Sequence, residues 1–469
     1  MQLTRLNVLL ASTLSAGLLT ASSLSAAPYE LVDLGTLGGV EAYALAINAS
    51  NQVTGASDGP EIPADDVTED NPATQCPIGN VVTFREFCRH GFLYTGGTMI
   101  DLGDLGFFTS YTYDLNDAGI AVGNSFISND QGDDDDTNDT IDEYGVVSVN
   151  GAPMEALPVN PDVTVAETAL QQRALSINNL NQIVGYMLYP NPTTDLNGDP
   201  TTIDRIRGYI YDYDNDTYTM VPAFEDDADL QSSVRGINEA GIVVGWGVAN
   251  DEFEPSRALV WDSNSADAQS TDLGTLGGYF SYANDINNNN ILVGRADTST
   301  VFGENNNLAF YYDMNAATPE MVAVPEFSDD PDFTTSVAFA INDLDQIVGS
   351  AQISAGFTPV NTAFLYDITT QTLTNLNDMV DCDLNWELNI AYDINDSGVI
   401  TGVGTLNGIA RAYMLVPTGE TEPTNCTELR NQEREQERDD AQDSAGGGGS
   451  TGFFWLMLGS LVLMRRRKQ

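Results

Sequence analysis

A nine-residue motif that occurs seven times constrains the fold of this chain more than any other feature. It consists of an aliphatic residue, Asn, two variable residues, a turn residue, an aliphatic stretch and a closing Gly, as in Ile47 to Gly55 and Ile394 to Gly402. Consecutive copies are 49 to 68 residues apart, and their Asn residues are Asn48, Asn116, Asn178, Asn238, Asn287, Asn342 and Asn395. A unit that recurs at this period indicates a repeat architecture.

The motif itself predicts a tight β-hairpin. Its fifth position holds only residues that tolerate a positive φ, namely Asn51, Gly119, Asn181, Gly241, Asn290, Asp345 and Gly398. An opening Asn followed by such a residue suits a type I turn with a bulge, and the Asn side chain can bond backbone groups inside the turn. The closing Gly indicates that another chain segment approaches closely. We therefore interpret both features as structural.

Each motif is followed by two further strand-like runs, which makes four strands per unit. The third runs include 257–262, 308–313 and 362–367, and the fourth include 269–274 and 320–325. Four-stranded sheets repeated around an axis form a β-propeller. The predicted fold class is therefore all-β, a seven-bladed β-propeller of four-stranded blades.

The two ends of the repeat region indicate that the ring is closed by the N-terminal strand. The seventh unit has three runs, the third at 410–416, and then lacks a fourth. The segment from Tyr29 to Gly39 matches the fourth run of unit 4, which reads Thr-Asp-Leu-Gly-Thr-Leu-Gly-Gly at 271–278. The N-terminal strand would complete the last blade and remove an exposed edge. The alternatives are an open β-solenoid or two smaller β domains.

Composition and charge limit the classes of partner that the protein can bind and indicate the compartment in which it folds. With 69 acidic and 17 basic residues, the formal net charge is −52, which repels nucleic acid and anionic lipid and suits a solvated acidic coat. Residues 1–27 have the features of a signal peptide: Arg5, an apolar run from Leu6 to Leu19, and small residues before Pro28. In an oxidising space, four cysteines predict two disulfides. From proximity alone we pair Cys76 with Cys88 and Cys382 with Cys426.

The remaining segments divide the chain further. We assign the propeller to 28–417, an acidic, charged linker to 418–445, and a sorting tail to 446–469 that contains a Gly-rich stretch, an apolar run of 12 residues from Phe453 to Met464, and a basic cluster at 465–468. The apolar run is short for a spanning helix, and the basic end should remain cytoplasmic. A plain C-terminal membrane anchor is the alternative interpretation of the tail.

Two parts of the sequence resemble known families. The tail resembles the GlyGly-CTERM sorting signal, which implies cleavage by a rhombosortase-like protease, export by a type II secretion system and only transient contact with the inner membrane. The seven motifs, the Ala-Phe runs at 309–310 and 363–364 and the Asp-Leu-Gly-Thr-Leu-Gly-Gly segments resemble the extracellular HAF-repeat proteins, and the larger family of unknown function found in marine gamma-proteobacteria. That second resemblance covers almost the whole mature chain and implies no activity.

The sequence offers little that indicates catalysis. A catalytic triad needs a base, and the one His, His90, has no evident nucleophile beside it, so we expect a structural role. Paired carboxylates at the mouth of the channel could serve a glycosidase, but 69 acidic residues give no basis for choosing two. The cysteines form no cluster with His for zinc. We therefore expect a protein that is not an enzyme.

Calcium is the best-defined cofactor hypothesis. Asp195, Asn197, Asp199 and Asp204 place oxygen ligands at alternating positions and then one carboxylate later, as hard cations prefer. The loop departs from the EF-hand pattern, because Pro200 stands where the turn Gly belongs and Asp204 comes too early. A second acidic loop contains Asp133 to Asp136, Asp139 and Asp142. A solvated acidic loop is the alternative for both.

We expect a secreted or surface-displayed, non-catalytic binding or structural module, with a calcium-stabilised adhesin as its narrower form. Insertions at 58–89, 127–143 and 190–205 would enlarge one rim of the ring, where an extracellular glycan or protein would bind. The alternative is a secreted polysaccharide hydrolase or lyase with carboxylates at the channel mouth. The sequence does not identify the ligand.

Overall fold

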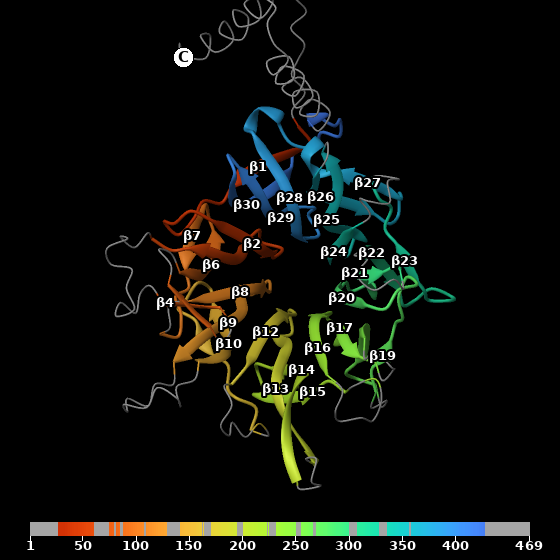
Figure 1. Cartoon of the computed structure of the whole chain (residues 1–469). Helices are drawn as coiled ribbons and strands as arrows, with labels where there is room; N and C mark the ends of the chain where they lie inside the picture. Colours follow the sequence, from red (N-terminus) through yellow and green to blue (C-terminus); the bar gives the residue numbers. More distant parts are fainter. Residues whose placement is uncertain are drawn as a thin grey trace, which may run out of the picture.

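The computed structural model describes residues 27–60, 75–78, 81–84, 88–106, 109–128, 141–161, 163, 170–194, 200–222, 224, 231–249, 255–265, 269–299, 307–327, 335–355 and 358–426. Within them, seven four-stranded antiparallel sheets surround a central axis, so the fold is the predicted seven-bladed β-propeller (Figure 1). The first strand of each blade is the innermost one, and inner strands of neighbouring blades contact one another.

The strands of each blade follow one another along the chain, except in the last blade. Blade 1 contains β2 (Ala42–Ile47), β3 (Val53–Asp58), β6 (Arg89–Thr95) and β7 (Thr98–Asp101); blade 2 contains β8 (Ser110–Leu115), β9 (Ile120–Ser128), β10 (Ile141–Val149) and β11 (Glu155–Ala156); blade 3 contains β12 (Gln172–Ile177), β13 (Gln182–Thr194), β14 (Pro200–Asp212) and β15 (Thr217–Met220); blade 4 contains β16 (Ser232–Ile237), β17 (Ile242–Val248), β18 (Ser256–Asp262) and β19 (Thr271–Asp272).

The other three blades follow the same plan. Blade 5 contains β20 (Ser281–Ile286), β21 (Ile291–Asp297), β22 (Asn307–Asp313) and β23 (Met321–Ala323); blade 6 contains β24 (Ser336–Ile341), β25 (Gln346–Ala355), β26 (Thr358–Asp367) and β27 (Thr372–Asn375); blade 7 contains β28 (Trp386–Ile394), β29 (Ile400–Leu406), β30 (Ile409–Pro417) and β1 (Tyr29–Asp33). Outside the blades lie the hairpin β4 (Gln75–Ile78) and β5 (Val81–Phe84), and the short 3-10 helices η4 (Leu376–Asp378) and η5 (Cys382–Leu384).

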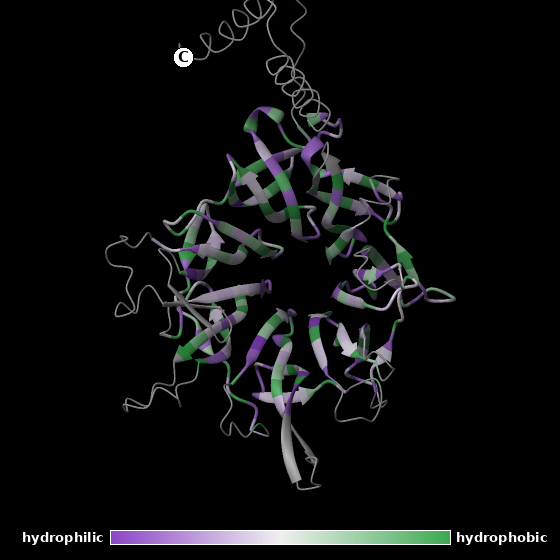
Figure 2. Ribbon diagram, in the orientation of Figure 1, coloured by the Kyte–Doolittle hydropathy of each residue, from purple (hydrophilic) through white to green (hydrophobic). Residues whose placement is uncertain are grey.

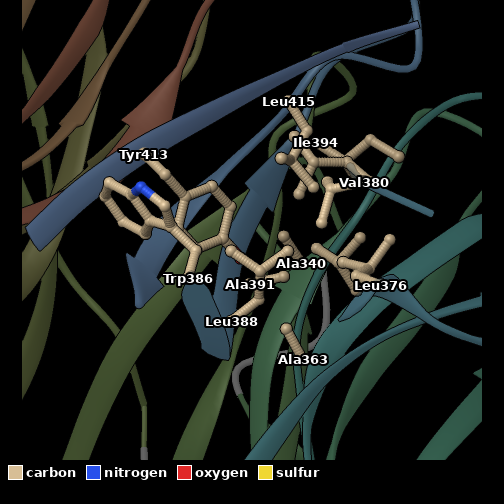
Figure 3. Packing of buried hydrophobic residues seen from close by; sticks show 12 residues of the cluster. Ala340, Ala363, Leu376, Val380, Trp386, Leu388, Ala391, Ile394, Tyr413 and Leu415 are labelled. Atoms are coloured by element: carbon tan, nitrogen blue, oxygen red, sulfur yellow. The ribbon is translucent and has the colours of Figure 1, made fainter. Parts of the chain in front are cut away.

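The N-terminal strand closes the ring, as the sequence predicts. β1 pairs antiparallel with β30, from Tyr29 opposite Pro417 to Asp33 opposite Tyr413. In Figure 1 the red β1 therefore lies beside the blue β30. Tyr29 and Leu31 pack against the core of this blade, in which Trp386 and Tyr413 meet edge to face with ring centroids 6.4 Å apart (Figure 3). The first and last strands thus share one hydrophobic core.

The fourth strands are shorter than the sequence runs that predicted them. β1, β19 and β23 end earlier than the runs to Gly39, 274 and 325. In the Asp-Leu-Gly segments, the Gly adopts a positive φ (77° at Gly35, 76° at Gly274), and its N–H bonds the carboxylate of the preceding Asp at 2.9 Å and 2.7 Å. This local turn ends the extended conformation, so β1 and β19 are shorter than the strands predicted from these segments.

The repeated motif folds as predicted. All seven fifth-position residues have positive φ, between 58° and 74°. The closing Gly is required because a Cβ added at any of the seven positions would overlap the backbone carbonyl oxygen of the paired inner strand; at Gly294 that oxygen belongs to Tyr282. Hydrophobic and hydrophilic residues are interspersed along the strands (Figure 2).

Two faces of the ring can now be named. The inner strands end at the seven Asn turns, and we call that side the turn face. The inner strands begin, and the second strands end, at the opposite side, which we call the insertion face. The connections from β3 to β6, β9 to β10 and β13 to β14 leave the ring there. The three predicted insertions therefore belong to one rim.

Candidate functional site: the central channel

The centre of the ring contains two cavities in line with its axis. One of about 340 Å³ lies among the inner strands, and its lining includes Leu45, Tyr113, Leu175, Arg235, Asn284, Phe339 and Tyr392 together with Asp114, Asp285 and Asp393. A second, of about 220 Å³, is formed by the Asn turns at the turn face. Every blade contributes to this channel, so its walls exist only once the ring is closed.

The turn face is held by a closed circle of hydrogen bonds between the motif Asn residues. Each Asn donates its Nδ2–H to the backbone carbonyl of the Asn in the next blade, at 3.0 to 3.2 Å, and Asn395 completes the circle by donating to Asn48. The Oδ1 of six of these Asn residues accepts two N–H groups of its own turn, as in Asn48 with Ser50 and Gln52, and the Oδ1 of Asn287 accepts the N–H of Ile291. These side chains are only 3 to 7% exposed. The predicted structural role is confirmed, and the bond between blades adds to it.

A second, outer row of hydrogen bonds joins the residues that follow each Asn. The backbone N–H of each residue donates to the side-chain oxygen of its equivalent in the next blade, from Ala49 to Asp117 at 2.8 Å through to Asp343 to Asp396 at 2.9 Å. The row ends at the junction of blades 7 and 1, because Ala49 has no side-chain oxygen to offer the N–H of Asp396.

Three carboxylates occupy the neck of the channel, two residues before the Asn in blades 2, 5 and 7. Each Asp uses one oxygen for the N–H of the residue after it and the other for an N–H in the next blade. Asp285, for example, accepts from Ile286 at 2.8 Å and from Ile341 at 2.9 Å, and Asp393 accepts from Ile47 at 2.8 Å. Burial raises the pKa of Asp285 to about 6, and it raises the pKa of Asp393 well above its usual range. Each carboxylate thereby links two blades.

Above the neck, towards the insertion face, aromatic and arginine side chains surround the channel. We call this set the collar; its members are Tyr43, Arg89, Tyr111, Tyr113, Arg173, Tyr186, Arg235, Trp246, Tyr282, Arg295, Phe339 and Tyr392. All are half-buried except Arg235, which is exposed. They come from the inner strands, from the second strands and, for Arg89, from a third strand.

Ring contacts connect the collar within and between blades. Phe339 of blade 6 meets Tyr392 of blade 7 at 4.9 Å, and Trp246 of blade 4 meets Tyr282 of blade 5 edge to face at 6.4 Å. Guanidinium groups lie over tyrosine rings in three blades: Arg89 over Tyr43 at 4.5 Å, Arg173 over Tyr186 at 5.8 Å and Arg295 over Tyr282 at 4.8 Å.

Two of the collar arginines are neutralised by carboxylates. Arg89 forms ion pairs with Glu41 at 2.6 Å and with Asp58 at 3.0 Å. Arg173 pairs with Glu143, whose side chain also accepts a hydrogen bond from Asn124 at 2.6 Å. Burial raises the pKa of Glu143, and the charge of Arg173 opposes that rise. These two arginines are therefore fixed parts of the wall.

The candidate calcium ligands fall mostly outside the described residues. Asp195, Asn197 and Asp199 lie there, and so do Asp133 to Asp136 and Asp139. Asp204 is on β14, opposite Pro190 of β13, in a hairpin that leaves the ring at the insertion face. Asp142 is buried on β10 and accepts a hydrogen bond from the N–H of Leu170 at 2.8 Å. Within the described residues, no group of three or more His, Cys, Asp or Glu side chains is placed to hold a metal.

The structure places His90 away from the channel, on the third strand of blade 1. Its Nδ1 is 3.0 Å from Asp101 and its Nε2 is 3.5 Å from Asp104. This pair of carboxylates holds the ring at the outer part of the blade.

Of the two predicted disulfides, the structure describes one. Cys382 and Cys426 form a disulfide with a Cα–Cα distance of 5.2 Å, which is the second of the two predicted pairs. Cys426 is fully buried, and Thr424 beside it donates to the carbonyl of Asp378, so the segment after β30 is fastened to blade 7. The side chain of Cys76 is outside the described residues, so the Cys76–Cys88 pair stays a prediction.

Sequence reasoning missed the collar and the three neck carboxylates. A signal was available for the carboxylates, because Asp114, Asp285 and Asp393 occupy the same place in three motifs. No such signal marks Arg235, whose equivalents in the other blades include Leu45, Asn284 and Phe339.

Residues 1–26 of the predicted signal peptide (1–27), residues 427–445 of the predicted linker and the whole predicted sorting tail (446–469) lie outside the described residues. Among the helices that the structure describes, none combines the length and the apolar character that a membrane crossing needs.

Comparisons with known proteins find a matching family model over part of the chain and distant structural similarities. Residues 275–389 match the family described as "Protein of unknown function (DUF3466)". No relative is found among curated proteins. Similar solved structures include a protein of unknown function from Dyadobacter fermentans DSM 18053 (11% identity, TM-score 0.39, 83% of this chain and 98% of that one) and the β-propeller domain of the Trilobed protease from Pyrococcus furiosus (7% identity, TM-score 0.45, 82% and 95%).

A Trypanosoma rangeli sialidase in complex with the inhibitor DANA is also similar, with 10% identity, a TM-score of 0.33, and 69% of this chain and 56% of that one covered. The similarities are distant, and no function is transferred from any of these proteins.

Proposed function

We propose that this protein is an exported, non-catalytic binding module whose ligand site is the collar at the insertion face. The observation that carries the proposal is the ring of half-buried aromatic side chains around the channel, to which all seven blades contribute. Aromatic faces of this kind bind the apolar faces of sugar rings and the side chains of proteins. A glycan or a protein segment is accordingly the expected ligand.

Small residues as well as these aromatic side chains pack between the blades. The contacts between neighbouring inner strands use small residues, because Ala44, Ala174, Ala283, Ala338 and Ala391 occupy the same position in five blades and are fully buried. Five collar residues are next to these alanines along the strands, namely Tyr43, Arg173, Tyr282, Phe339 and Tyr392. Tyr113, Phe339 and Tyr392 line the 340 Å³ cavity. Aromatic surface that borders a cavity, in addition to its contacts between blades, supports a role in binding.

The positions of the three insertions also favour a binding site at the insertion face. All three long connections leave the ring on the side where the collar lies, so a ligand in the channel mouth would meet them as well. In propellers and other rigid scaffolds, such loops are where binding specificity resides. Export through a signal peptide, processing by a rhombosortase-like protease and release by a type II secretion system would place this face outside the cell.

The binding proposal is tested with the mature ring against a glycan array and against cell-surface extracts. Trp246→Ala and Tyr282→Ala should each lower the affinity of the best ligand at least tenfold. Tyr312→Ala, which removes an aromatic from the third strand of blade 5, is the matched control and should leave the affinity unchanged. Equal affinity for all four proteins would contradict a site in the collar.

A narrower form of the proposal is a calcium-stabilised adhesin. It depends on the loop with Asp195, Asn197 and Asp199 and on Asp204 at its end. Calcium should then raise the thermal midpoint, and the double variant Asp195→Ala with Asp199→Ala should abolish the increase. A midpoint that is insensitive to calcium would leave a binding module without this cation.

The second candidate function is a polysaccharide hydrolase or lyase. The pKa values of Asp285 and Asp393, both raised by burial, favour it because a protonated carboxyl can act as a general acid near neutral pH. Against it, each carboxylate already accepts backbone N–H groups through both oxygens. Turnover of any glycan that is lost in Asp285→Asn and Asp393→Asn, but not in Trp246→Ala alone, would favour the enzyme.

A further inference from the structure

Arg235 differs from the other channel residues in charge and exposure. It lies on β16 at the bulge between Val234 and Gly236, where the register with β17 shifts, and its side chain reaches the 340 Å³ cavity. It is the one collar residue whose side chain is exposed rather than half-buried. A positive charge is thus presented inside the channel of a protein whose net charge is −52.

Arg295 lies across the junction of blades 4 and 5 from Arg235, within electrostatic range of it. Arg295 is on β21, directly opposite Tyr282 of β20, and its guanidinium lies 4.8 Å above that ring. The strands β16 and β20 are in contact. Although Arg235 is exposed by its surface area, its guanidinium lies within the channel, where desolvation by the walls lowers its pKa. The positive charge of Arg295 lowers the pKa of Arg235 further, against the opposing effect of Tyr186 and Tyr282. Two like charges are therefore held close together.

No carboxylate neutralises this pair among the described residues. The ion pairs of that part of the chain involve Arg89, His90 and Arg173 only. Asp297 is near enough for Arg295 to oppose the rise that burial causes in its pKa, but the two form no ion pair. In a sequence with 69 acidic residues, two adjacent arginines without a counterion form a site that an external anion can satisfy.

We propose that Arg235 and Arg295 form an oxyanion subsite of the collar, which binds the carboxylate or sulfate group of an acidic sugar while Tyr282 and Trp246 contact its ring. This inference rests on the proposed function and specifies its ligand class. A guanidinium offers paired N–H donors whose spacing matches two oxygens of either anion. Arg235 lines the cavity of about 340 Å³, which has the size of a small-ligand pocket, and the other three residues lie outside its lining. The acidic remainder of the surface repels anions, which favours anion binding at a local concentration of positive charge such as this one.

The test compares three probes that share one ring: galactose, galacturonic acid and galactose 6-sulfate, with sodium sulfate as the anion alone. Calorimetry with the mature protein in 0.15 M NaCl would measure the affinity for each. We expect at least one acidic sugar to bind ten times more tightly than galactose. A preference for galacturonic acid or for the sulfate ester identifies the anion, and either supports the subsite.

Arg235→Gln and Arg295→Gln remove one donor group each, and Arg411→Gln removes the same charge from the third strand of blade 7. Each of the two collar variants should lower the affinity for the acidic sugar at least tenfold. Each should also reduce the sulfate-dependent rise in thermal midpoint by more than half. Arg411→Gln should change neither, and thermal unfolding without anion confirms that all three variants fold.

Equal responses of wild type and the Arg235→Gln, Arg295→Gln double variant to every anionic probe would overturn the subsite. The outcome is distinguishable from failure of the binding module, because a glycan-array ligand that still depends on Trp246 would then remain. Loss of every glycan and protein ligand from the array would overturn both proposals.

Discussion

The Nδ2 of Asn395 donates a hydrogen bond to the backbone carbonyl of Asn48 at 3.0 Å, across 347 residues of sequence. This bond joins the last blade to the first at the turn face. On the outer side of the same junction, β1 pairs with β30. The ring is thus closed twice, once by side chains at its centre and once by a strand near its rim.

Replacing Asn395 by Ala should destabilise the ring at this junction. The substitution removes the bonds to Asn48 and Asn51 and leaves the N–H groups of Ser397 and Val399 without their acceptor, and Val399 is buried. We expect a loss of about 2 to 4 kcal/mol in the free energy of unfolding, measured by guanidinium denaturation. Asn264→Ala, at an exposed turn, is the control and should stay within about 0.5 kcal/mol of wild type. Similar losses for both variants would refute the role of the circle.

Ala49→Asn should stabilise the protein. Asn179 and Asn288 already accept, through Oδ1, the N–H of the equivalent residue in the preceding blade. An Asn at position 49 could accept the N–H of Asp396 in the same way and complete the outer row. The expected gain is about 0.5 to 1.5 kcal/mol, one net hydrogen bond, seen as a higher thermal midpoint. Ala49→Val, which adds bulk without an acceptor, should give no such increase.

The disulfide should protect the segment after β30. Cys382 and Cys426 are 44 residues apart, so the bond restricts a long loop of the unfolded chain. The double substitution to Ala should lower the free energy of unfolding by about 2 to 4 kcal/mol and speed amide hydrogen exchange at 418–426. Cys76→Ala with Cys88→Ala serves as the comparison, and faster exchange at 418–426 in that variant would contradict the assignment.

The neck carboxylates should make the protein more stable at mildly acidic pH. Burial raises the pKa of Asp285 to about 6 from 3.8, so between these values the folded state holds a proton that the unfolded state has released. The contribution of this group to the free energy of unfolding therefore falls as pH rises from about 4 to 6, by at most about 1.4 kcal/mol per pH unit. Asp114 and Asp393, whose pKa values burial also raises, act in the same direction.

Urea unfolding of Asp285→Asn at pH 4, 5, 6 and 7 checks this prediction. The variant loses a hydrogen-bond acceptor, which lowers its stability at every pH, but its curve should decline less steeply between pH 4 and 6 than that of wild type. Asp383→Asn, which removes a surface carboxylate, is the control for the loss of one negative charge. Parallel curves for Asp285→Asn and wild type would rule out titration of the neck.

The fold was largely predictable because its units are local. A positive-φ residue three positions after each motif Asn, and a Gly that admits the carbonyl of the neighbouring strand, specify a hairpin within nine residues, and each of the seven copies folds in this way. The repeat of the Asp-Leu-Gly segment also identified Tyr29–Asp33 as the missing strand of blade 7. Only the length of the fourth strands was wrong, since the turn at Gly35 and Gly274 begins inside the repeated segment.

What the sequence alone determined is therefore the blade, the number of blades and the strand that closes them, because these depend on turn chemistry and alternation over short distances. The tertiary structure alone decided the channel. Arg235 and Arg295 are 60 residues apart and sit in non-equivalent positions of their blades. No repeat pattern marks either residue. Only the radial packing of neighbouring sheets brings the two guanidiniums together with Tyr282, and only closure of the ring turns seven separate strand edges into one site.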